Sequence, residues 1–90
     1  MVELNVVVRL RIMPENPDVD LEKIRKEASS VINKTGKVHS IETTPIAFGI
    51  SALDVVFLLN DAAGGMEEIE KKLSKVSGVG EVSVGEISRL

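Results

Sequence analysis

The chain has 90 residues, of which 43% are hydrophobic and 28% are charged, and its formal net charge at pH 7 is −3. A chain of this length forms one small domain that buries somewhat more than roughly half of its unfolded surface, so there is little room for an enclosed active site. We therefore expect a single domain over residues 1–90 whose function is carried on its surface. Because acidic and basic residues are interspersed, we expect no direct contact with nucleic acid.

Several compartments and site types are excluded by what the chain lacks. No apolar run approaches the roughly 20 residues that span a bilayer. The N-terminal stretch does not resemble a secretory signal, because Glu3 and Asn5 interrupt it and two arginines fall inside it. The chain contains no cysteine, which removes disulfides, thiolate nucleophiles and metal sites built on Cys. We expect a cytoplasmic protein with no membrane contact, no cofactor and no metal site.

The first half of the chain predicts a strand followed by a helix. Apolar residues alternate strictly over residues 4–12, a pattern that predicts a half-buried strand. Either Asp18 or Asp20 can cap the helix that follows. Apolar residues at spacings of three and four over residues 21–31 predict an amphipathic helix packed on one side. Gly36 is available for a left-handed residue at the helix exit.

Two strands are predicted next. Residues 37–44 are mostly polar, and their apolar residues Val38 and Ile41 differ in parity, which favours an edge strand with a bulge. Residues 52–60 form a nearly continuous apolar run that only Asp54 interrupts. This run suits a central strand, although periodicity alone leaves a buried helix open.

The last third repeats the order of helix and strand. Residues 61–65 are a predicted turn, whose paired glycines lack the Lys and Ser or Thr of a P-loop and the third glycine of a dinucleotide fingerprint. We therefore expect only a connection, with Gly65 near the N-cap of a helix over residues 66–76. A final strand over residues 79–87 should either be bulged or leave the sheet near Gly85, because its apolar residues change parity there.

The order strand, helix, strand, strand, helix, strand predicts an α+β fold of the ferredoxin-like βαββαβ type. Its four-stranded sheet should have the order 4-1-3-2, with two helices on one face and with Arg9 and Arg11 on the other. We further expect the first and third strands to run parallel. On that topology Phe48 and the C-terminal residues 88–90 emerge at the same end of the sheet, roughly 10 to 20 Å apart.

Residues 45–50 are the predicted connection between the two middle strands. Pro45 cannot donate to a central ladder, and Gly49 permits backbone conformations that other residues avoid. Phe48, one of only two aromatic residues in the chain, lies between them. Taken alone, an aromatic ring at a loop tip more often folds back onto its own domain than contacts a partner. Its predicted position beside the C-terminus favours a docking surface instead.

The sequence contains no arrangement typical of covalent catalysis. Its single histidine, His39, falls on the polar strand and is interpreted as a surface residue. The neighbouring acids Glu67 and Glu68 are better explained as first-turn charges of a helix than as an acid-base pair or as metal ligands. We therefore expect no catalytic residues.

Five segments together resemble the archaeal translation elongation factor 1-beta family. They are residues 11–15, 19–21, 45–50, 61–65 and 87–90, and the most specific is the loop at 45–50. The resemblance spans essentially the whole chain. It implies a guanine nucleotide exchange factor for elongation factor 1-alpha, the GTPase that brings aminoacyl-tRNA to the ribosome. Such a factor acts by binding and is not an enzyme of covalent chemistry, and we expect it to be a monomer when free.

The resemblance also implies two kinds of partner contact. Phe48 matches the family's loop phenylalanine, which fills an apolar pocket of the GTPase. Arg89 stands before the final Leu90, where eukaryotic members carry a lysine described as reaching the magnesium site of the GTPase. Guanidinium and ammonium groups are not interchangeable at a tight ion site, so Arg89 either pairs with a carboxylate or anchors the tail. The implied partner-binding residues are Pro45, Ile46, Phe48, Gly49, Arg89 and Leu90.

Other proteins with this topology are weighed against that interpretation. An RNA-recognition domain stacks bases on aromatic residues of its first and third strands, whereas this chain offers only Phe57 there. A metal-carrying ferredoxin-like domain would need a Cys pair after the first strand. A ferredoxin-like small-molecule regulatory or protein-interaction module stays open as the alternative.

Overall fold

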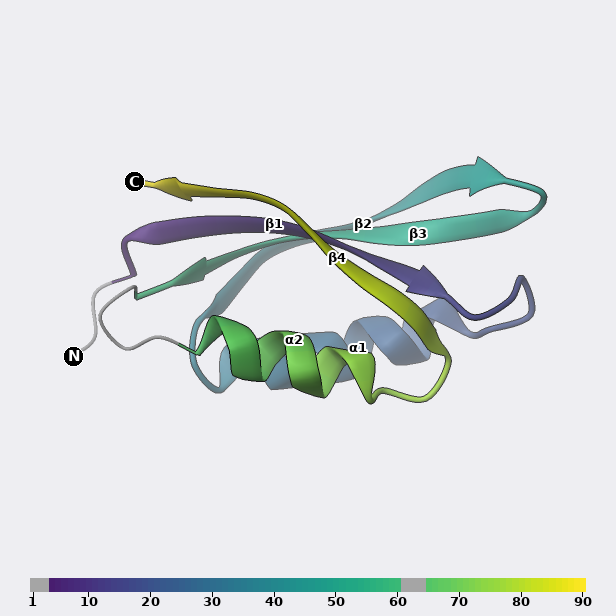
Figure 1. Cartoon of the computed structure of the whole chain (residues 1–90), viewed down its shortest axis with the longest axis horizontal. Coiled ribbons are helices and arrows are strands. Elements are labelled where there is room, and N and C mark those ends of the chain that lie inside the picture. The colour runs from purple at the N-terminus through teal and green to yellow at the C-terminus, as the bar shows by residue number, and fades with distance from the viewer. Residues whose placement is uncertain (1–3, 61–64) are drawn as a thin grey trace.

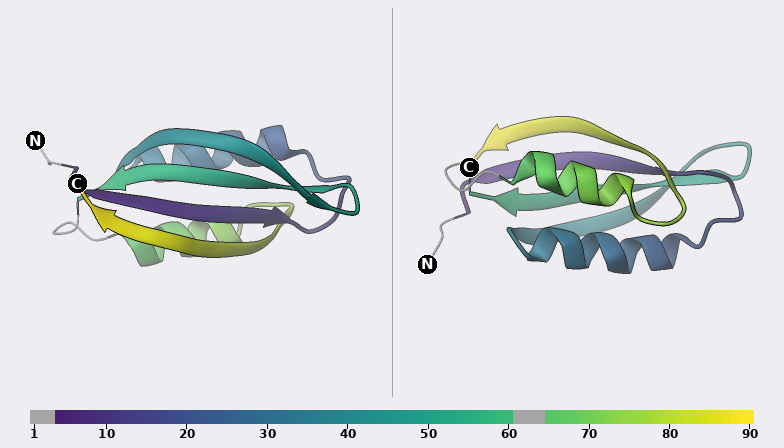
Figure 2. Two further views of the ribbon diagram at one scale, coloured as in Figure 1. Left: turned by 90° about the horizontal axis from the view of Figure 1, so that it is seen from above. Right: turned by 60° about the horizontal axis from the view of Figure 1, so that its bottom comes forward.

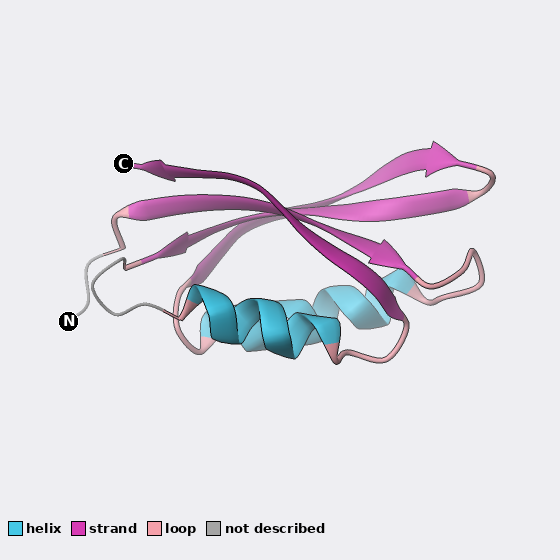
Figure 3. Ribbon diagram, in the orientation of Figure 1, coloured by secondary structure: helices cyan, strands magenta, loops and turns pink. Residues whose placement is uncertain are grey.

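The computed structural model describes residues 4–60 and 65–90, which form a four-stranded sheet with two helices against one face (Figures 1 and 3). In chain order the elements are β1 (Val6–Pro14), α1 (Leu21–Asn33), β2 (Lys37–Ala47), β3 (Ile50–Leu59), α2 (Met66–Ser74) and β4 (Val79–Arg89). The strand order β2-β3-β1-β4 confirms the predicted ferredoxin-like α+β fold. Among the described residues, no helix is both long and apolar enough to cross a membrane.

The core lies between the sheet and the helices, because the helices cover only one face of the sheet (Figure 2). Every second residue of β1 and β3 points into it, which explains the alternation in the sequence of β1. The buried strand residues of this core are Val6, Val8, Leu10, Ile12, Leu53, Val55, Phe57, Leu59 and Val79. The helices contribute Ile24, Ala28, Ile32, Ile69 and Leu73.

The residues at the helix ends agree in part with the caps predicted from the sequence. Asp20, one of two candidate caps, accepts a hydrogen bond from the backbone N–H of Glu22 at 3.0 Å. Gly65 is the N-cap of α2, as predicted, with φ of 101°; the rest of the predicted turn lies outside the described residues. The expected left-handed role of Gly36 is wrong, because its φ is not positive. Gly36 is instead required by close packing, since a Cβ there would overlap the carbonyl oxygen of Leu58.

Both edge strands contain a bulge, which is one of the alternatives that their parity changes left open. In β2 the register shifts between Val38 and Ser40, so that Val38 pairs with Phe57 and Ile41 pairs with Val55. Because residues paired across strands share a face, the bulge turns both apolar residues of this polar strand toward the core.

The bulge in β4 has the same effect. Val84 pairs with Leu10 and Ile87 pairs with Val8, with a register shift where Gly85 is skipped. The change of parity therefore keeps Ile87 on the helix-covered face of the sheet, although 56% of its surface stays exposed.

The expected direction of β3 is wrong. β1 and β3 are adjacent and antiparallel, as are β1 with β4 and β2 with β3. The helical crossover makes β2 run in the same direction as β1, and the tight hairpin then reverses the chain into β3. As a result, the β2–β3 turn lies where β1 ends, whereas β4 ends where β1 begins.

Candidate partner-binding site

The connection between β2 and β3 is a two-residue turn made by Phe48 and Gly49. Pro45 and Ile46 belong to β2, and the strand pairing resumes at Ala47 with Ile50, so the loop is shorter than predicted. Both turn residues have positive φ, 54° at Phe48 and 77° at Gly49. Positive φ at both central residues defines a type I′ turn, whose twist matches that of the flanking strands.

Phe48 occupies this turn at a cost to the fold. Its side chain is 96% exposed, so the interpretation that the ring folds back onto its own domain is wrong. A left-handed conformation costs a residue with a Cβ about 1–2 kcal/mol, and type I′ turns favour Asn followed by Gly. A strained, bulky, exposed side chain at a turn tip indicates that the residue serves something other than folding.

The exposed apolar side chains mark both ends of the sheet. Among the described residues, the large hydrophobic side chains that are exposed are Ile46, Phe48, Ile87 and Leu90. The first two belong to the β2–β3 hairpin, Ile87 lies in the last part of β4, and Leu90 follows that strand. The residues predicted to bind a partner therefore form two separate groups.

The tail lies at the opposite end of the molecule from Phe48. Arg89 pairs with Val6 at the start of β1, and the backbone N–H of Leu90 donates to the carbonyl oxygen of Asn5 at 2.9 Å. Figure 1 shows the C-terminus and the β2–β3 turn at opposite ends of the longest dimension, which is 42 Å. The prediction that both emerge at one end is wrong, because it assumed that β1 and β3 run parallel.

An open apolar groove of about 400 Å³ borders the tail. Arg89 of β4 and Met66, the first residue of α2, both line this groove. Its lining residues are Val6, Val8, Leu59, Asn60, Met66, Ile87, Ser88 and Arg89. The tail end thus combines an exposed apolar surface with a cationic side chain.

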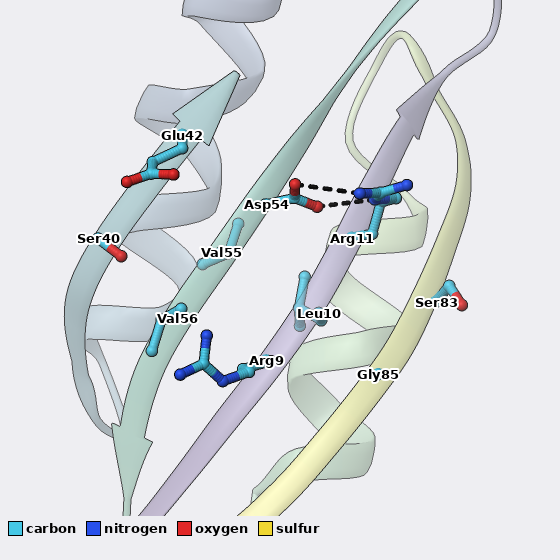
Figure 4. A pocket seen from close by; sticks show the side chains of 10 residues that line it. All are labelled: Arg9, Leu10, Arg11, Ser40, Glu42, Asp54, Val55, Val56, Ser83 and Gly85. Carbon is cyan, nitrogen blue, oxygen red and sulfur yellow. Dashed lines mark hydrogen bonds and ion pairs between the residues drawn. The ribbon is translucent and has the colours of Figure 1, made fainter. Parts of the chain in front are cut away.

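A hollow of about 520 Å³ lies on the helix-free face of the sheet (Figure 4). Arg9 and Arg11 are exposed there, as predicted. The guanidinium of Arg11 donates to both carboxylate oxygens of Asp54, at 2.7 and 3.1 Å. The hydroxyl of Thr44 donates to the same carboxylate at 2.6 Å. We call Arg11, Thr44 and Asp54 the carboxylate cluster.

The sequence alone does not predict the carboxylate cluster. In the sequence Asp54 interrupts an apolar run, and its parity, opposite to that of buried Val55, is the one signal that it faces away from the core. Its partners come from β1 and β2, and the pairing that joins them depends on strand register. Sequence spacing alone does not contain that register.

The cluster changes the ionisation of its members. The hydrogen bond from Arg11, followed by that from Thr44, lowers the pKa of Asp54 below its ordinary value. The same contact raises the pKa of Arg11. Both shifts favour the charged forms at neutral pH.

These shifts predict how stability depends on pH. A carboxylate whose folded pKa is depressed stabilises the fold above its unfolded pKa of about 3.9, and this stabilisation is lost as the pH falls through the folded value. We therefore expect Asp54→Asn to lower the free energy of unfolding at pH 7, and the difference from the unchanged protein to shrink as the pH falls below the unfolded pKa and through the folded one. Urea unfolding of the two proteins at pH 7 and at acid pH measures this difference. A difference of equal size under the two conditions would contradict the depressed pKa of Asp54.

The other polar groups named in the sequence analysis lie apart from the carboxylate cluster. His39 is exposed at the bulge of β2, as predicted. In residues 4–60 and 65–90, no group of three or more His, Asp or Glu side chains could hold a metal ion.

Comparison with known proteins identifies the family. A family model described as the EF-1 guanine nucleotide exchange domain matches residues 7–90. The chain belongs to this family. Elongation factor 1-beta of Methanothermobacter thermautotrophicus is 43% identical over 86 residues, which cover 96% of this chain and 97% of that protein. Elongation factor 1-beta of Methanobrevibacter smithii is 40% identical over 85 residues, 94% of this chain and 96% of that protein.

Solved structures support the fold of this exchange domain. The ACT domain of GTP pyrophosphokinase from Chlorobium tepidum superposes with a TM-score of 0.57 at 21% identity, covering 96% of this chain and 99% of that domain. The C-terminal domain of the MgtC protein from Mycobacterium tuberculosis superposes with a TM-score of 0.61 at 16% identity, covering 97% of this chain and 88% of that domain. At these identities the likeness concerns architecture alone.

The resemblance to the elongation factor 1-beta family is confirmed by the family model and by these relatives.

Proposed function

We propose that the chain is a guanine nucleotide exchange factor that promotes GDP release and GTP reloading on elongation factor 1-alpha. The observation that carries this proposal is the match of the exchange domain over residues 7–90, supported by relatives named elongation factor 1-beta that align over nearly their full length. We expect the protein to act in the cytoplasm, as a monomer when free, without nucleic acid or membrane as a direct partner.

The proposed mechanism is thermodynamic linkage. A factor that binds the nucleotide-free GTPase more tightly than the GDP-bound form weakens GDP binding by the same ratio, and GTP in the cell then refills the site. The chain needs only to contact the GTPase differently in the two states. Covalent chemistry is not required of it.

The proposed contacts lie at both ends of the sheet. At the hairpin, Phe48 fills an apolar pocket of the GTPase, and Pro45, Ile46 and Gly49 shape the strand and turn that present it. At the tail, Arg89 pairs with a carboxylate of the GTPase, and Leu90 adds apolar contact. The strain and 96% exposure of Phe48 support the first contact, and the apolar groove beside Arg89 supports the second. One GTPase would then be held at two points along a 42 Å molecule.

Release of a fluorescent GDP analogue from the cognate elongation factor 1-alpha tests the function. We expect substoichiometric amounts of the chain to accelerate release by about a hundredfold, within the usual range of coupling between two binding sites. An unchanged release rate at a concentration where the two proteins form a complex would refute the proposed function.

A further inference from the structure

We infer that Asp54 is a positioning residue for Phe48: its carboxylate fixes the direction in which the β2–β3 hairpin leaves the sheet. The inference rests on the proposed function, since it concerns how the hairpin is presented to the GTPase. Asp54 itself is not among the proposed partner contacts.

The end of the hairpin extends beyond the rest of the sheet. Pairing between β1 and β3 ends at Ile12 with Leu53. Pairing between β2 and β3 continues through Thr44 with Ala52 as far as the turn. We call residues 45–51 the hairpin arm; Figures 1 and 2 show it rising from the sheet beyond the end of β1.

A two-stranded arm does not define its own direction. Two-stranded ribbons twist more, and more variably, than wider sheets, and an isolated hairpin is only marginally stable. A small change of twist at the base moves the tip, where the aromatic ring lies. The placement of Phe48 therefore depends on how the base of the arm is held.

The carboxylate cluster holds that base. Asp54 is one residue from Leu53, the last residue of β3 paired with β1. Its carboxylate accepts from Arg11 on β1 and from Thr44 on β2, so one group joins three adjacent strands on the helix-free face. A bidentate contact between guanidinium and carboxylate fixes orientation as well as distance. On the opposite face, the fully buried side chain of Leu53 holds the same base.

The exposure of the cluster argues for a geometric role. The side chains of Arg11 and Asp54 are 45% and 34% exposed. Ion pairs with this much access to water contribute little to stability. Loss of the pair should therefore leave the protein folded while releasing the arm.

A double-mutant cycle tests the inference. We expect Asp54→Ala to lower the exchange rate constant per unit concentration by about tenfold when Phe48 is present, and by less than about twofold in a Phe48→Ala background. The reason is that the Asp54 carboxylate affects exchange only by positioning the Phe48 ring. Equal losses in both backgrounds, or no loss in either, would overturn the inference.

Two further variants sharpen the cycle. Thr44→Val keeps the side-chain shape but removes the donor, and we expect a smaller loss that also depends on Phe48. Arg9→Ala is the matched control, because Arg9 is an exposed arginine of β1 that lines the same hollow away from the base of the arm. We expect it to leave exchange unchanged. A loss equal to that of Asp54→Ala would assign the hollow to direct partner contact and refute positioning.

A measurement without the GTPase separates this inference from the proposed function. Backbone amide order parameters should be near about 0.85 throughout the sheet and should fall at Phe48 and Gly49 in Asp54→Ala, while those of β1 stay unchanged. If the unchanged protein has no exchange activity but Asp54→Ala still lowers these order parameters, Asp54 holds the hairpin arm. In that case only the proposed function is refuted. Unaltered order parameters would refute the positioning role directly.

Discussion

Replacing Phe48 by asparagine is expected to make the protein more stable and a far weaker exchange factor. Asparagine is the residue that the first position of a type I′ turn followed by glycine favours, and it tolerates the left-handed conformation that Phe48 is forced to adopt at φ of 54°. The ring contributes no core packing, because 96% of it is exposed. We expect a gain of about 1 kcal/mol, or about 4–8 °C in melting temperature.

The same substitution should lower exchange by about thirtyfold or more. A buried aromatic anchor at the centre of an interface contributes about 2 kcal/mol or more, and asparagine cannot fill an apolar pocket. Phe48→Ala should show a similar loss of exchange of well over about tenfold, with thermal unfolding nearly unchanged. Thermal melts and GDP-release assays on both variants, with Thr43→Ala of the exposed edge of β2 as the control, measure the two effects separately.

The opposite pattern would reassign Phe48. If both variants lost several kcal/mol of stability with exchange intact, the ring would be part of the fold and the proposed contact would fail. A gain of stability together with a loss of exchange would show that the residue is kept at this turn against the preference of the local backbone.

Removing the cation at the other end is expected to slow exchange more than it weakens binding. Arg89→Ala should lower the maximal rate of GDP release by about tenfold while the affinity for the GTPase falls by less than about threefold. Arg89→Lys should retain part of the rate, because it keeps the charge but loses the planar fork. Stopped-flow release at saturating factor and a separate binding titration distinguish rate from affinity.

Substitution is a sharper test here than truncation. Deleting residues 89 and 90 should also lower the rate more than binding, but it removes the pairing of Arg89 with Val6 and the hydrogen bond from Leu90 to Asn5. Arg89→Ala leaves the backbone pairing in place. Lys26→Ala, on the exposed face of α1, controls for the loss of one positive charge. Unaltered release by Arg89→Ala would end the assignment of Arg89 to exchange.

Much of the architecture was predictable because its signals are local. The strict alternation of β1 follows from a sheet covered on one face, and the parity changes of β2 and β4 marked the positions where the structure has bulges. The residues of the hairpin and of the tail were identified by resemblance to the family. None of these inferences depends on which strands are neighbours in the sheet.

What failed or was missed depends on contacts between distant segments. The exposure of Phe48 followed from the resemblance to the family and not from its local sequence, because exposure depends on whether any other element packs against the turn. Asp54 acquired its role only when Arg11 and Thr44 were placed beside it, each from a different strand.

The sequence by itself determined the order of elements, the two faces of β1, the parity changes in β2 and β4, and the family to which the chain belongs. The tertiary structure alone decided that Phe48 and Arg89 lie at opposite ends of the sheet and that one carboxylate joins three strands at the base of the hairpin. The physical reason is that residue periodicity records which side of an element meets the core. The direction and register of neighbouring strands are instead fixed by crossovers and by pairing across the whole sheet.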